Sequence, residues 1–476
     1  MIRPSKTIIA FGAWLLLSTG VGLYYGFIFK EADDKSAILP GKTTHGHYQI
    51  ELACSECHDQ ELAENIFTSS GVSNESCNKC HGEDLEDAQD SHPTKKFKNP
   101  ENYIFLQHID ALQCITCHRE HDAKVTGEMG TTIPADYCAH CHEMTLENLD
   151  SHKDLPFNTC ATTGCHNYHD NQALAPTYLL KHYAEPTNLP SQTISPTTPL
   201  LNWLADGNKA RAPLSPQQAD APPEKSKKQE ILDSWQHSSH AAAGINCSEC
   251  HGGAETQKAW VDQPDHTSCS SCHSYEVETF LKGKHGMRLA AGLSPMTPGT
   301  ARSPMKKDAA HASLSCSSCH DSHSVDRQFA SQQACIQCHD DDHTKNYAGS
   351  PHAKLWENEL AGISPIGSGV SCATCHLPAT SQGDGFAANH NQNQNLTPNE
   401  KMLKDTCMQC HGMQFSMDSL ADRDLITANF SAPPSKHHGG IDMAVESAIS
   451  RGDENIIKLR EYLDSLSENP KPKDKQ

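Results

Sequence analysis

The stretch Cys316-Ser317-Ser318-Cys319-His320-Asp321-Ser322-His323 contains the pattern that decides the fold of this chain. Two cysteines separated by two residues and followed directly by a histidine are the pattern of a c-type haem attachment site. The two thiols become thioethers to the porphyrin edge, and the neutral imidazole of the histidine binds the iron. The further histidine, His323, is a candidate ligand for the opposite side of an iron.

The pattern occurs eleven times in 476 residues and uses all 22 cysteines. The cysteines, in chain order, are Cys54 and Cys57, Cys77 and Cys80, Cys114 and Cys117, Cys138 and Cys141, Cys160 and Cys165, Cys247 and Cys250, Cys269 and Cys272, Cys316 and Cys319, Cys335 and Cys338, Cys372 and Cys375, and Cys407 and Cys410. The histidines that follow them are His58, His81, His118, His142, His166, His251, His273, His320, His339, His376 and His411. Because no cysteine is left over, this pattern argues against disulfides and zinc sites. The sequence therefore predicts eleven covalently attached haem c groups.

The fifth motif, Cys160 to His166, has four residues between its cysteines where the other ten motifs have two. Gly164 can take a positive φ and let the longer loop fold back, which favours a working attachment site. The alternative is that this motif is broken. The segment resembles small tetrahaem cytochromes of the c3 type, in which CxxxxCH motifs occur, and the resemblance implies a working site.

The second axial ligand of each haem decides between electron transfer and catalysis. An iron with both axial positions filled passes electrons, whereas an open position can bind a substrate. Of the 31 histidines, 11 belong to the motifs, and the remaining 20 are enough for two histidines at every iron. The distal candidates are His47 (or His45), His92, His108, His121, His152, His169, His182, His240, His266, His285, His311, His323, His343, His352, His390 and His438 (or His437).

Four motifs are followed by a second histidine three or four residues after the first, at His118/His121, His166/His169, His320/His323 and His339/His343. The second histidine cannot reach the far side of the haem that its neighbour holds. It can reach an adjacent haem, and this would bring two macrocycles into the close contact that electron tunnelling needs. A surface histidine is the alternative interpretation at each position.

The composition predicts a fold built on cofactors. Only 36% of the residues are hydrophobic and 6% aromatic, which is a small supply of core for this length. Eleven macrocycles, each fixed to the backbone at two points, would supply the missing apolar interior. We therefore expect a mainly α, haem-stacked fold with much irregular loop, and two haem domains behind one N-terminal transmembrane helix.

The distribution of motifs predicts the domain organisation. We expect a membrane anchor over 1–30, a pentahaem domain over 31–182, a Pro-rich linker over 183–230, a hexahaem domain over 231–440 and a C-terminal helix and tail over 441–476. His47 and His240 each lie seven residues before a Cys-Ser-Glu-Cys-His motif. This echo indicates either a module used twice or convergence on the same short motif.

Residues Thr7 to Phe29 form an uncharged, largely apolar run of bilayer-spanning length, preceded by Arg3 and Lys6. No small-residue cleavage site follows it, so we favour an uncleaved anchor over a cleaved signal peptide. The basic end would stay in the cytoplasm. Resemblance to bacterial c-type cytochromes implies the same topology, with the haem domains in the periplasm and the helix in the cytoplasmic membrane.

The net charge of −21 argues against nucleic acid as a partner. Residues 31–185 hold 26 Asp and Glu against 10 Lys and Arg. This acidity suits a redox protein with a basic docking face, and Glu83-Asp84-Leu85-Glu86-Asp87 is the expected docking patch. Solubility alone is the alternative explanation.

Two further resemblances bear on function. Trp235-Gln-His-Ser-Ser-His240, Gly283-Lys-His285, Ser350-Pro-His352 and His390-Asn-Gln-Asn resemble the lineage of octahaem hydroxylamine oxidoreductases, octahaem tetrathionate reductases and cytochrome c554. Tyr137-Cys-Ala-His-Cys-His-Glu-Met144 resembles the first motif of membrane-anchored quinol dehydrogenases, which implies membrane quinol as a partner. The leading hypothesis is a membrane-anchored periplasmic electron carrier with no catalytic residues. The alternative is an oxidoreductase acting on a small nitrogen or sulfur compound at one open haem of the C-terminal half, near Lys284, His285, His390 and Asp340 to Asp342.

Overall fold

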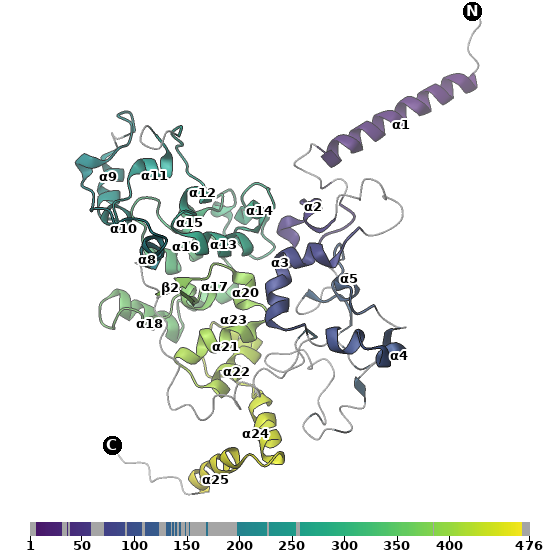
Figure 1. The fold of residues 1–476 in the computed structure, drawn as a ribbon, viewed down its shortest axis with the longest axis vertical. Coiled ribbons are helices and arrows are strands. Elements are labelled where there is room, and N and C mark those ends of the chain that lie inside the picture. Colours follow the sequence, from purple (N-terminus) through teal and green to yellow (C-terminus); the bar gives the residue numbers. More distant parts are fainter. Residues whose placement is uncertain are drawn as a thin grey trace, which may run out of the picture.

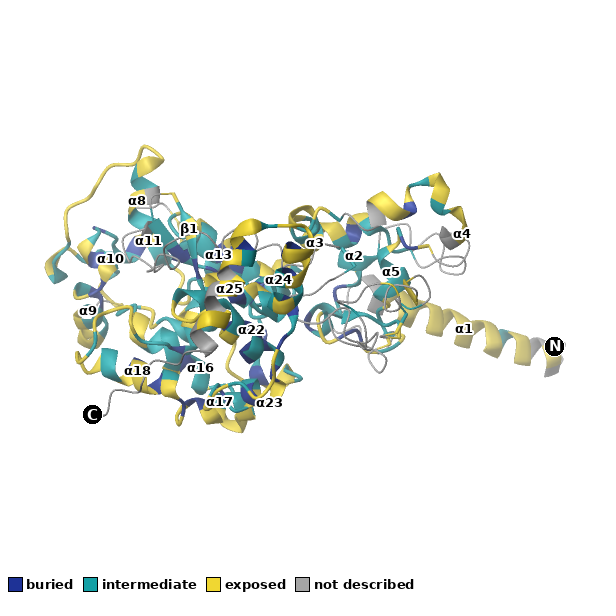
Figure 2. Cartoon of the chain, turned by 90° about the horizontal axis from the view of Figure 1, so that it is seen from below, coloured by how far each residue is buried: buried dark blue, intermediate teal, exposed yellow. Residues whose placement is uncertain are grey.

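The computed structural model describes residues 6–30, 39–58, 71–90, 93–106, 110–122, 130–134 and 198–468, the last range apart from 226–227, 254–257 and 384, together with isolated residues between 31 and 169. We call the described residues 39–169 the N-terminal half and residues 198–468 the C-terminal half. Figure 1 shows α1 projecting from the N-terminal half, and Figure 2 shows the same helix from a perpendicular direction.

The described chain is mainly helical with much irregular loop, which confirms that part of the predicted fold class. The helices of the N-terminal part are α1 (Lys6–Lys30), α2 (Cys54–Cys57), α3 (Asn74–Asp87), α4 (Tyr103–Leu106) and α5 (Cys114–Cys117). Those that follow are α8 (Thr198–Ala205), α9 (Gln229–Gln236), α10 (Ser239–Ala242), α11 (Cys247–His251), α12 (His266–Cys269), α13 (Ser274–Lys282), α14 (Met287–Ala290), α15 (Cys316–Cys319), α16 (Ala334–Ile336), α17 (Asp342–Tyr347), α18 (Pro351–Leu360), α19 (Cys372–His376), α20 (Gln392–Leu396), α21 (Met402–Asp405), α22 (Met413–Ala421), α23 (Arg423–Thr427), α24 (Gly440–Ser450) and α25 (Glu454–Glu468). Strands β1 (Ala379–Gln382) and β2 (Gly385–Ala388) form an antiparallel hairpin with Ala379 opposite Ala388.

Five of the short helices, α2, α5, α11, α15 and α19, begin at the first cysteine of a motif. One helical turn places residues i and i+3 on the same face, so both thiols point to the same side. Local caps start several of these turns: the Asn246 side chain accepts from Cys247 N, and Ser371 accepts from Thr374 N in a capping box. The spacing of the motif and its helical backbone therefore both place the two thiols on the same side, where one porphyrin edge could bind them.

Helix α1 is the long apolar helix that the sequence predicted. Its window Ala10–Phe27 is long and apolar enough to cross a membrane. None of that window is buried against the rest of the chain, and Trp14, Leu16 and Leu23 are among its exposed side chains (Figure 2). A helix that is apolar all round and packs on nothing suits a lipid environment, and a signal sequence passes the same test.

The Pro-rich stretch packs on the C-terminal half over the second part of its length. Leu214 N donates to Ala241 O at 2.9 Å. Asp220 accepts from Ser248 N at 3.0 Å and from Ser248 Oγ at 2.5 Å, and Arg211 pairs with Glu249 at 2.5 Å. The linker expected to be extended over 183–230 instead forms α8, which packs on β2, and from about residue 211 it is docked beside the sixth motif, because its polar side chains pair with that motif. Residues 183–197 lie outside the described residues.

The tail consists of two helices where the sequence predicted one. Gly452, at a φ of 75°, separates α24 from α25. Ile456 is 1% exposed, while Ala444 and Ala448 are fully buried or nearly so. Ile441 packs against the small cluster of Leu403, Met417 and Leu420. The tail is thus attached to the C-terminal half (Figure 1).

The buried apolar residues are few and small. Of the 20 buried hydrophobic residues in the described chain, nine are alanines. Alanine buries little apolar area, so this set cannot by itself supply a core for a chain of this length. The interior needs another apolar component, and the arrangement of the histidines indicates where it lies.

Candidate haem centres

Nine motif histidines each face a second histidine across a gap. The pairs are His47–His81, His58–His121, His118–His169, His240–His273, His251–His323, His285–His339, His320–His390, His343–His376 and His352–His411. Their ring centroids lie 5.8 to 6.4 Å apart. Every pair joins one motif histidine to one histidine from outside the motifs.

This separation matches two imidazoles that bind one metal from opposite sides. With a metal–nitrogen bond of about 2.0–2.1 Å and about 1.1 Å from that nitrogen to the ring centre, the two centroids lie about 6.3 Å apart. Direct packing of two rings would also allow shorter separations. Nine pairs within a narrow range of this value therefore fit an iron between each pair of rings.

Hydrogen bonds fix which nitrogen faces the gap. In five of the paired histidines Nδ1 lies 2.5 to 3.2 Å from a backbone carbonyl oxygen. These are His118 with Gly130, His121 with Gly41, His251 with Val261, His343 with Ile426 and His390 with Ala388. A carbonyl only accepts, so Nδ1 carries the proton and Nε2 has the lone pair that a metal can use, although at His343 the Asn429 amide nitrogen also lies 3.3 Å from Nε2. Partners of this kind commonly orient metal-binding histidines.

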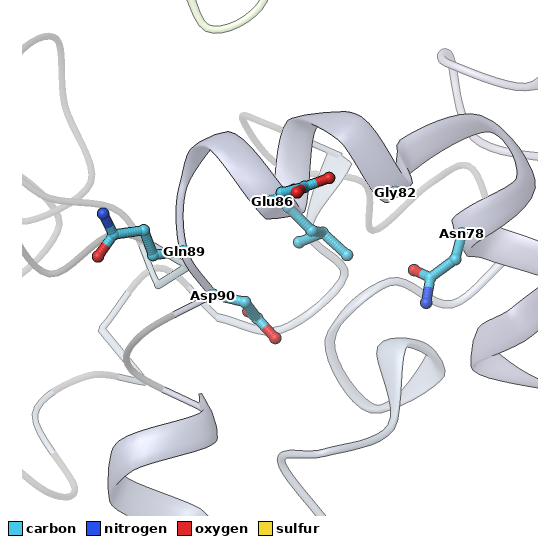
Figure 3. A pocket seen from close by; sticks show the side chains of 6 residues that line it. Asn78, Gly82, Glu86, Gln89 and Asp90 are labelled. Carbon is cyan, nitrogen blue, oxygen red and sulfur yellow. The ribbon is translucent and has the colours of Figure 1, made fainter.

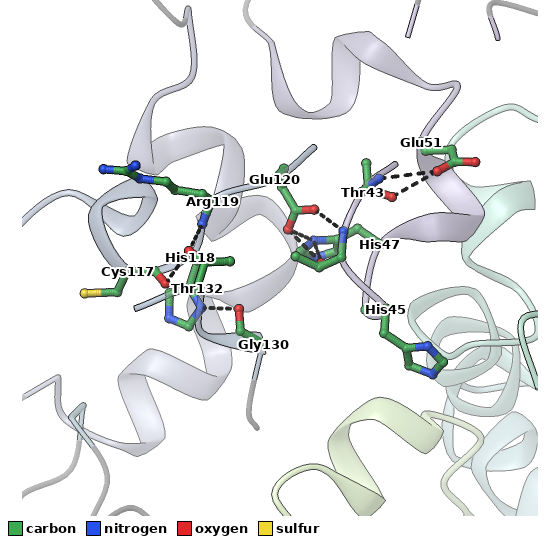
Figure 4. Close-up of polar contacts among 12 residues, drawn as sticks. Thr43, His45, His47, Glu51, Cys117, His118, Arg119, Glu120, Gly130 and Thr132 are labelled. Carbon is green, nitrogen blue, oxygen red and sulfur yellow. Dashed lines mark hydrogen bonds and ion pairs between the residues drawn. The ribbon is translucent and has the colours of Figure 1, made fainter. Parts of the chain in front are cut away.

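Two paired histidines of the N-terminal half have carboxylate partners instead. His47 Nδ1 lies 2.6 Å from Glu120 Oε1, and His169 Nδ1 lies 2.7 Å from Asp90 Oδ1. Thr44 adds two donors to Glu120, its N at 2.7 Å and its Oγ1 at 2.9 Å. Figure 4 shows the Glu120 carboxylate against the His47 ring. Burial raises the pKa of Glu120, but the hydrogen bond and charge of His47 and the Thr44 donors outweigh it, so the pKa lies below its ordinary value. The carboxylate is therefore charged at neutral pH.

Burial also keeps the central imidazoles neutral. Desolvation lowers the pKa of His285, His320 and His376 to about 4 in each case. A neutral imidazole has the free lone pair that iron needs, whereas an imidazolium does not. Each of these three rings can therefore bind a metal at neutral pH.

The second histidine of each CH-x-x-H sequence faces a different motif from the one it follows. His121 faces His58, His169 faces His118, and His323 faces His251. The longer version behaves in the same way, since His343 faces His376. Neighbouring motifs are thus joined through their histidines.

The two halves repeat one pairing scheme. The histidine seven residues before the first motif of each half faces the second motif, as His47–His81 and His240–His273, with the ring planes at 67° and 71°. The CH-x-x-H histidine of the third motif faces the first motif, as His58–His121 and His251–His323, with the planes at 20° and 6°. Convergence on a short motif does not explain the same partners at the same ring angles. The echo in the sequence therefore reflects a repeated module.

Some predicted ligands are not brought opposite a motif histidine. Within the described residues, no contact with a motif histidine ring is seen for His266 or His311. His438 is buried and accepts from Gly440 N at 3.1 Å, while the alternative His437 lies 2.6 Å from Asp442. His45, the alternative to His47, lies beside Tyr48. The candidates His92, His108 and His182 lie outside the described residues, as do His166 and the cysteines Cys138, Cys141, Cys160 and Cys165. His142 and His152 are described as isolated residues only.

Side chains that the sequence did not indicate help to position the rings. Trp260 stacks on His251 at 4.7 Å and 7°, and Phe415 stacks on His411 at 4.9 Å and 24°. Glu120 lies between His118 and His121 of a CH-x-x-H sequence, and this position is the only feature of the sequence that could have indicated its role beside a ligand histidine. Trp260 has no local signal, because its contact depends on the loop after α11.

A hollow of about 420 Å³ lies along α3 and is lined by Asn78, Gly82, Leu85, Glu86, Gln89 and Asp90. Figure 3 shows Asn78, Gly82 and Glu86 along one side of this helix and Asp90 beyond its end. Because Asp90 holds His169, which faces His118, the hollow belongs to the surroundings of that pair.

The cysteines do not form alternative sites in the part of the chain that the structure describes. There, 18 cysteines are free of disulfides, and no three His, Cys, Asp or Glu side chains converge on a possible metal position. Zinc cages of the usual kind need four such ligands. The described motifs therefore fit haem attachment better than zinc binding.

Comparison with known proteins gives two matches. The profile of the cytochrome c3 family matches residues 46–143 and 239–340, which correspond to the two repeats. The cytochrome subunit of an acrylate reductase from Shewanella woodyi (strain ATCC 51908 / MS32) is 30% identical over 102 residues, which cover 21% of this chain and 69% of the relative. These matches support covalently bound haem c. They do not test the resemblance to the octahaem lineage, which stays a prediction.

Proposed function

This chain belongs to the cytochrome c3 family of multihaem c-type cytochromes, and we propose that it carries electrons through eleven haem c groups between a donor and a redox partner. The relative is the cytochrome subunit of a reductase, which supports a role in passing electrons to or from a separate protein. When bound, haem c supplies reversible one-electron chemistry at its iron. The chain supplies the attachment, the axial ligands and the surroundings.

The observation that carries this proposal is that nine motif histidines each face a second histidine from outside the motifs. All six motif histidines of the C-terminal half face another histidine: His251, His273, His320, His339, His376 and His411. An iron held by both imidazoles of a pair would have no open position for a substrate. His285 and His390, candidates for an open site, themselves face His339 and His320. The geometry therefore favours electron transfer over catalysis in this half.

The membrane location is part of the proposal. Helix α1 would anchor the chain in a bacterial cytoplasmic membrane, with the haem-binding halves in the periplasm. Membrane quinol and a redox protein with a basic docking face are the proposed partners. An anchored carrier would accept electrons near the bilayer and deliver them at a distance from it.

The proposal is tested by counting haems and open iron sites in the purified holoprotein. Intact mass spectrometry should show eleven added haem masses, and EPR of the oxidised protein should show low-spin iron at the nine described pairs. The pairs with planes at 61° to 71° should give strongly anisotropic signals, and those at 6° to 20° rhombic ones. Free thiols in the mature chain would contradict the proposal, as would a high-spin signal that responds to nitrite, hydroxylamine or tetrathionate and belongs to a C-terminal motif.

The carboxylate on His47 gives a second expectation. Negative charge passed through the hydrogen bond favours ferric iron, so Glu120→Gln should raise the reduction potential of the site at His47 and His81. If the charge favours the ferric form tenfold, the shift is on the order of 60 mV for one electron. Spectroelectrochemical titration measures it. Glu101→Gln, at an exposed residue of the same half, is the control and should leave the titration unchanged.

A further inference from the structure

Basic side chains of the C-terminal half meet acidic side chains of the N-terminal half. Lys282 Nζ, at the end of α13, lies 3.0 Å from Glu83 Oε2. Lys401 Nζ lies 3.0 Å from Asp84 Oδ1. Glu83 and Asp84 belong to the acidic patch, residues 83–87, that we predicted from the sequence as the docking site for an external partner. In the folded chain, part of this patch is already paired with the chain's own C-terminal half.

Arg302 makes the most extensive contact of this surface. Its Nη1 donates to the carbonyls of Thr43 at 2.9 Å and Thr44 at 3.2 Å, and its Nη2 lies 3.2 Å from Glu51 Oε2. Its guanidinium also lies over the Tyr48 ring at 4.7 Å. The side chains of Arg302 and Glu51 are each 25% exposed, and Thr43 and Thr44 are buried. Such a shielded contact is stronger than the exposed lysine pairs.

Two more cations reach backbone oxygens of the same turn. Lys284 Nζ lies 3.1 Å from the Gly46 carbonyl and 3.4 Å from that of His45. Arg288 Nη1 donates to the Gln49 carbonyl at 2.8 Å, where α14 packs on the turn Tyr48–Ile50. The five cations of the C-terminal half that contact the N-terminal half are together called the junction: Lys282, Lys284, Arg288, Arg302 and Lys401.

The junction lies between ligand histidines of the two halves. Gly46 is followed directly by His47, which faces His81, and Glu83 follows His81 by two residues. On the other side, Lys284 is followed directly by His285, which faces His339. The contact between Lys284 and Gly46 therefore joins the two residues that directly precede His285 and His47.

Resting on the proposed function, we propose that the junction is an internal docking surface at which electrons pass between the sites at His47/His81 and His285/His339. With haem bound at both sites, one site would lose the electron that the other gains, with no proton or co-reactant. A local group of cations on the C-terminal half meets acidic side chains and backbone carbonyls of the N-terminal half, as at a docking site between two redox proteins. Their attraction is sensitive to salt, because the lysine pairs are exposed.

Charge reversal tests the docking. Arg302→Glu places a carboxylate against Glu51 and should increase the radius of gyration measured by small-angle X-ray scattering, with a larger increase at high salt. Adding Glu51→Arg should restore the wild-type radius. Lys354→Glu reverses a charge within α18, away from the junction, and is the matched control. An unchanged radius in Arg302→Glu, or failure of the double variant to close again while still binding its full set of haems, would overturn the inference.

The route is tested by adding a sub-stoichiometric flash of electrons and following their redistribution between haems of different potential. Redistribution should slow at least tenfold in Arg302→Glu and recover in the double variant. If the haems of Arg302→Glu accept electrons and redistribute them as fast as those of the wild type although its radius is larger, electrons do not need to cross the junction. That result would overturn the proposed route and leave the proposed function intact. Haems that accept no electrons even in the wild-type chain would overturn the proposed function.

Discussion

Replacing His323 by alanine is expected to open one iron site, and that site is the one held by His251. His323 follows the eighth motif in sequence, but its ring faces His251 of the sixth motif at 6.2 Å and 6°. Loss of the ring leaves one axial position empty, so one haem in eleven should change from low to high spin. In the ferrous state the same haem should bind carbon monoxide, which the wild-type C-terminal half should not.

A second substitution identifies the opened site. Combining His323→Ala with His251→Ala affects the same iron, so the number of altered haems should stay at one. Combining it with His390→Ala affects the iron at His320 as well, and the number should rise to two. His311→Ala is the control, because His311 is an exposed histidine that we also predicted as a ligand. A spin change in the control, or none in His323→Ala, would show that these pairings are wrong.

Replacing both Cys372 and Cys375 by alanine should remove one haem and destabilise the C-terminal half severely. The motif lies opposite His343 in that half, where burial lowers the pKa of His376 to about 4. Removal takes away a covalent staple, a contribution of about 2–5 kcal/mol if it resembles that of a disulfide. At roughly 2–4 °C per kcal/mol for domains of this size, the melting temperature should fall by about 4–20 °C.

Thermal unfolding followed by circular dichroism measures this effect, and the Soret absorbance measures the haem loss. The matched control is the pair Cys77→Ala and Cys80→Ala, which also removes one haem but at α3, where Cys80 is exposed. The control should lose the same absorbance with a smaller change in melting temperature of the C-terminal half. Equal destabilisation by both variants would mean that the haem at His376 is not a core element.

The local part of the site could be read from the sequence, because the attachment motif is complete within five residues. Its spacing also defines a helical turn, and α2, α5, α11, α15 and α19 begin where the motifs do. Histidine supply was another local count, and it agrees with the nine pairs. The general fold class followed from the low hydrophobic content, since a thin core and many attachment points leave little chain for sheets.

The pairings themselves could not be read, because they depend on how distant segments pack. Nothing in the sequence of Cys316 to His323 states that His323 faces the sixth motif. The repeat indicates this pairing, since His121 and His323 have equivalent places in the two halves. The shared five-residue motif alone was too short to establish that the halves repeat one module. The docking of the Pro-rich segment could not be predicted for a similar reason, because Asp220 accepts its hydrogen bonds from Ser248, 28 residues further along the chain.

The exchange of ligands between motifs makes completion of a site wait for a later stretch of chain. The rings that close the sites at His58, His118 and His251 are His121, His169 and His323, each further towards the C-terminus. If the chain is exported N-terminus first, as proposed, a haem attached at one of these motifs would lack its second histidine until the downstream segment emerges. Biogenesis would then pass through intermediates with open sites, and the order of export would set the order in which those sites are closed.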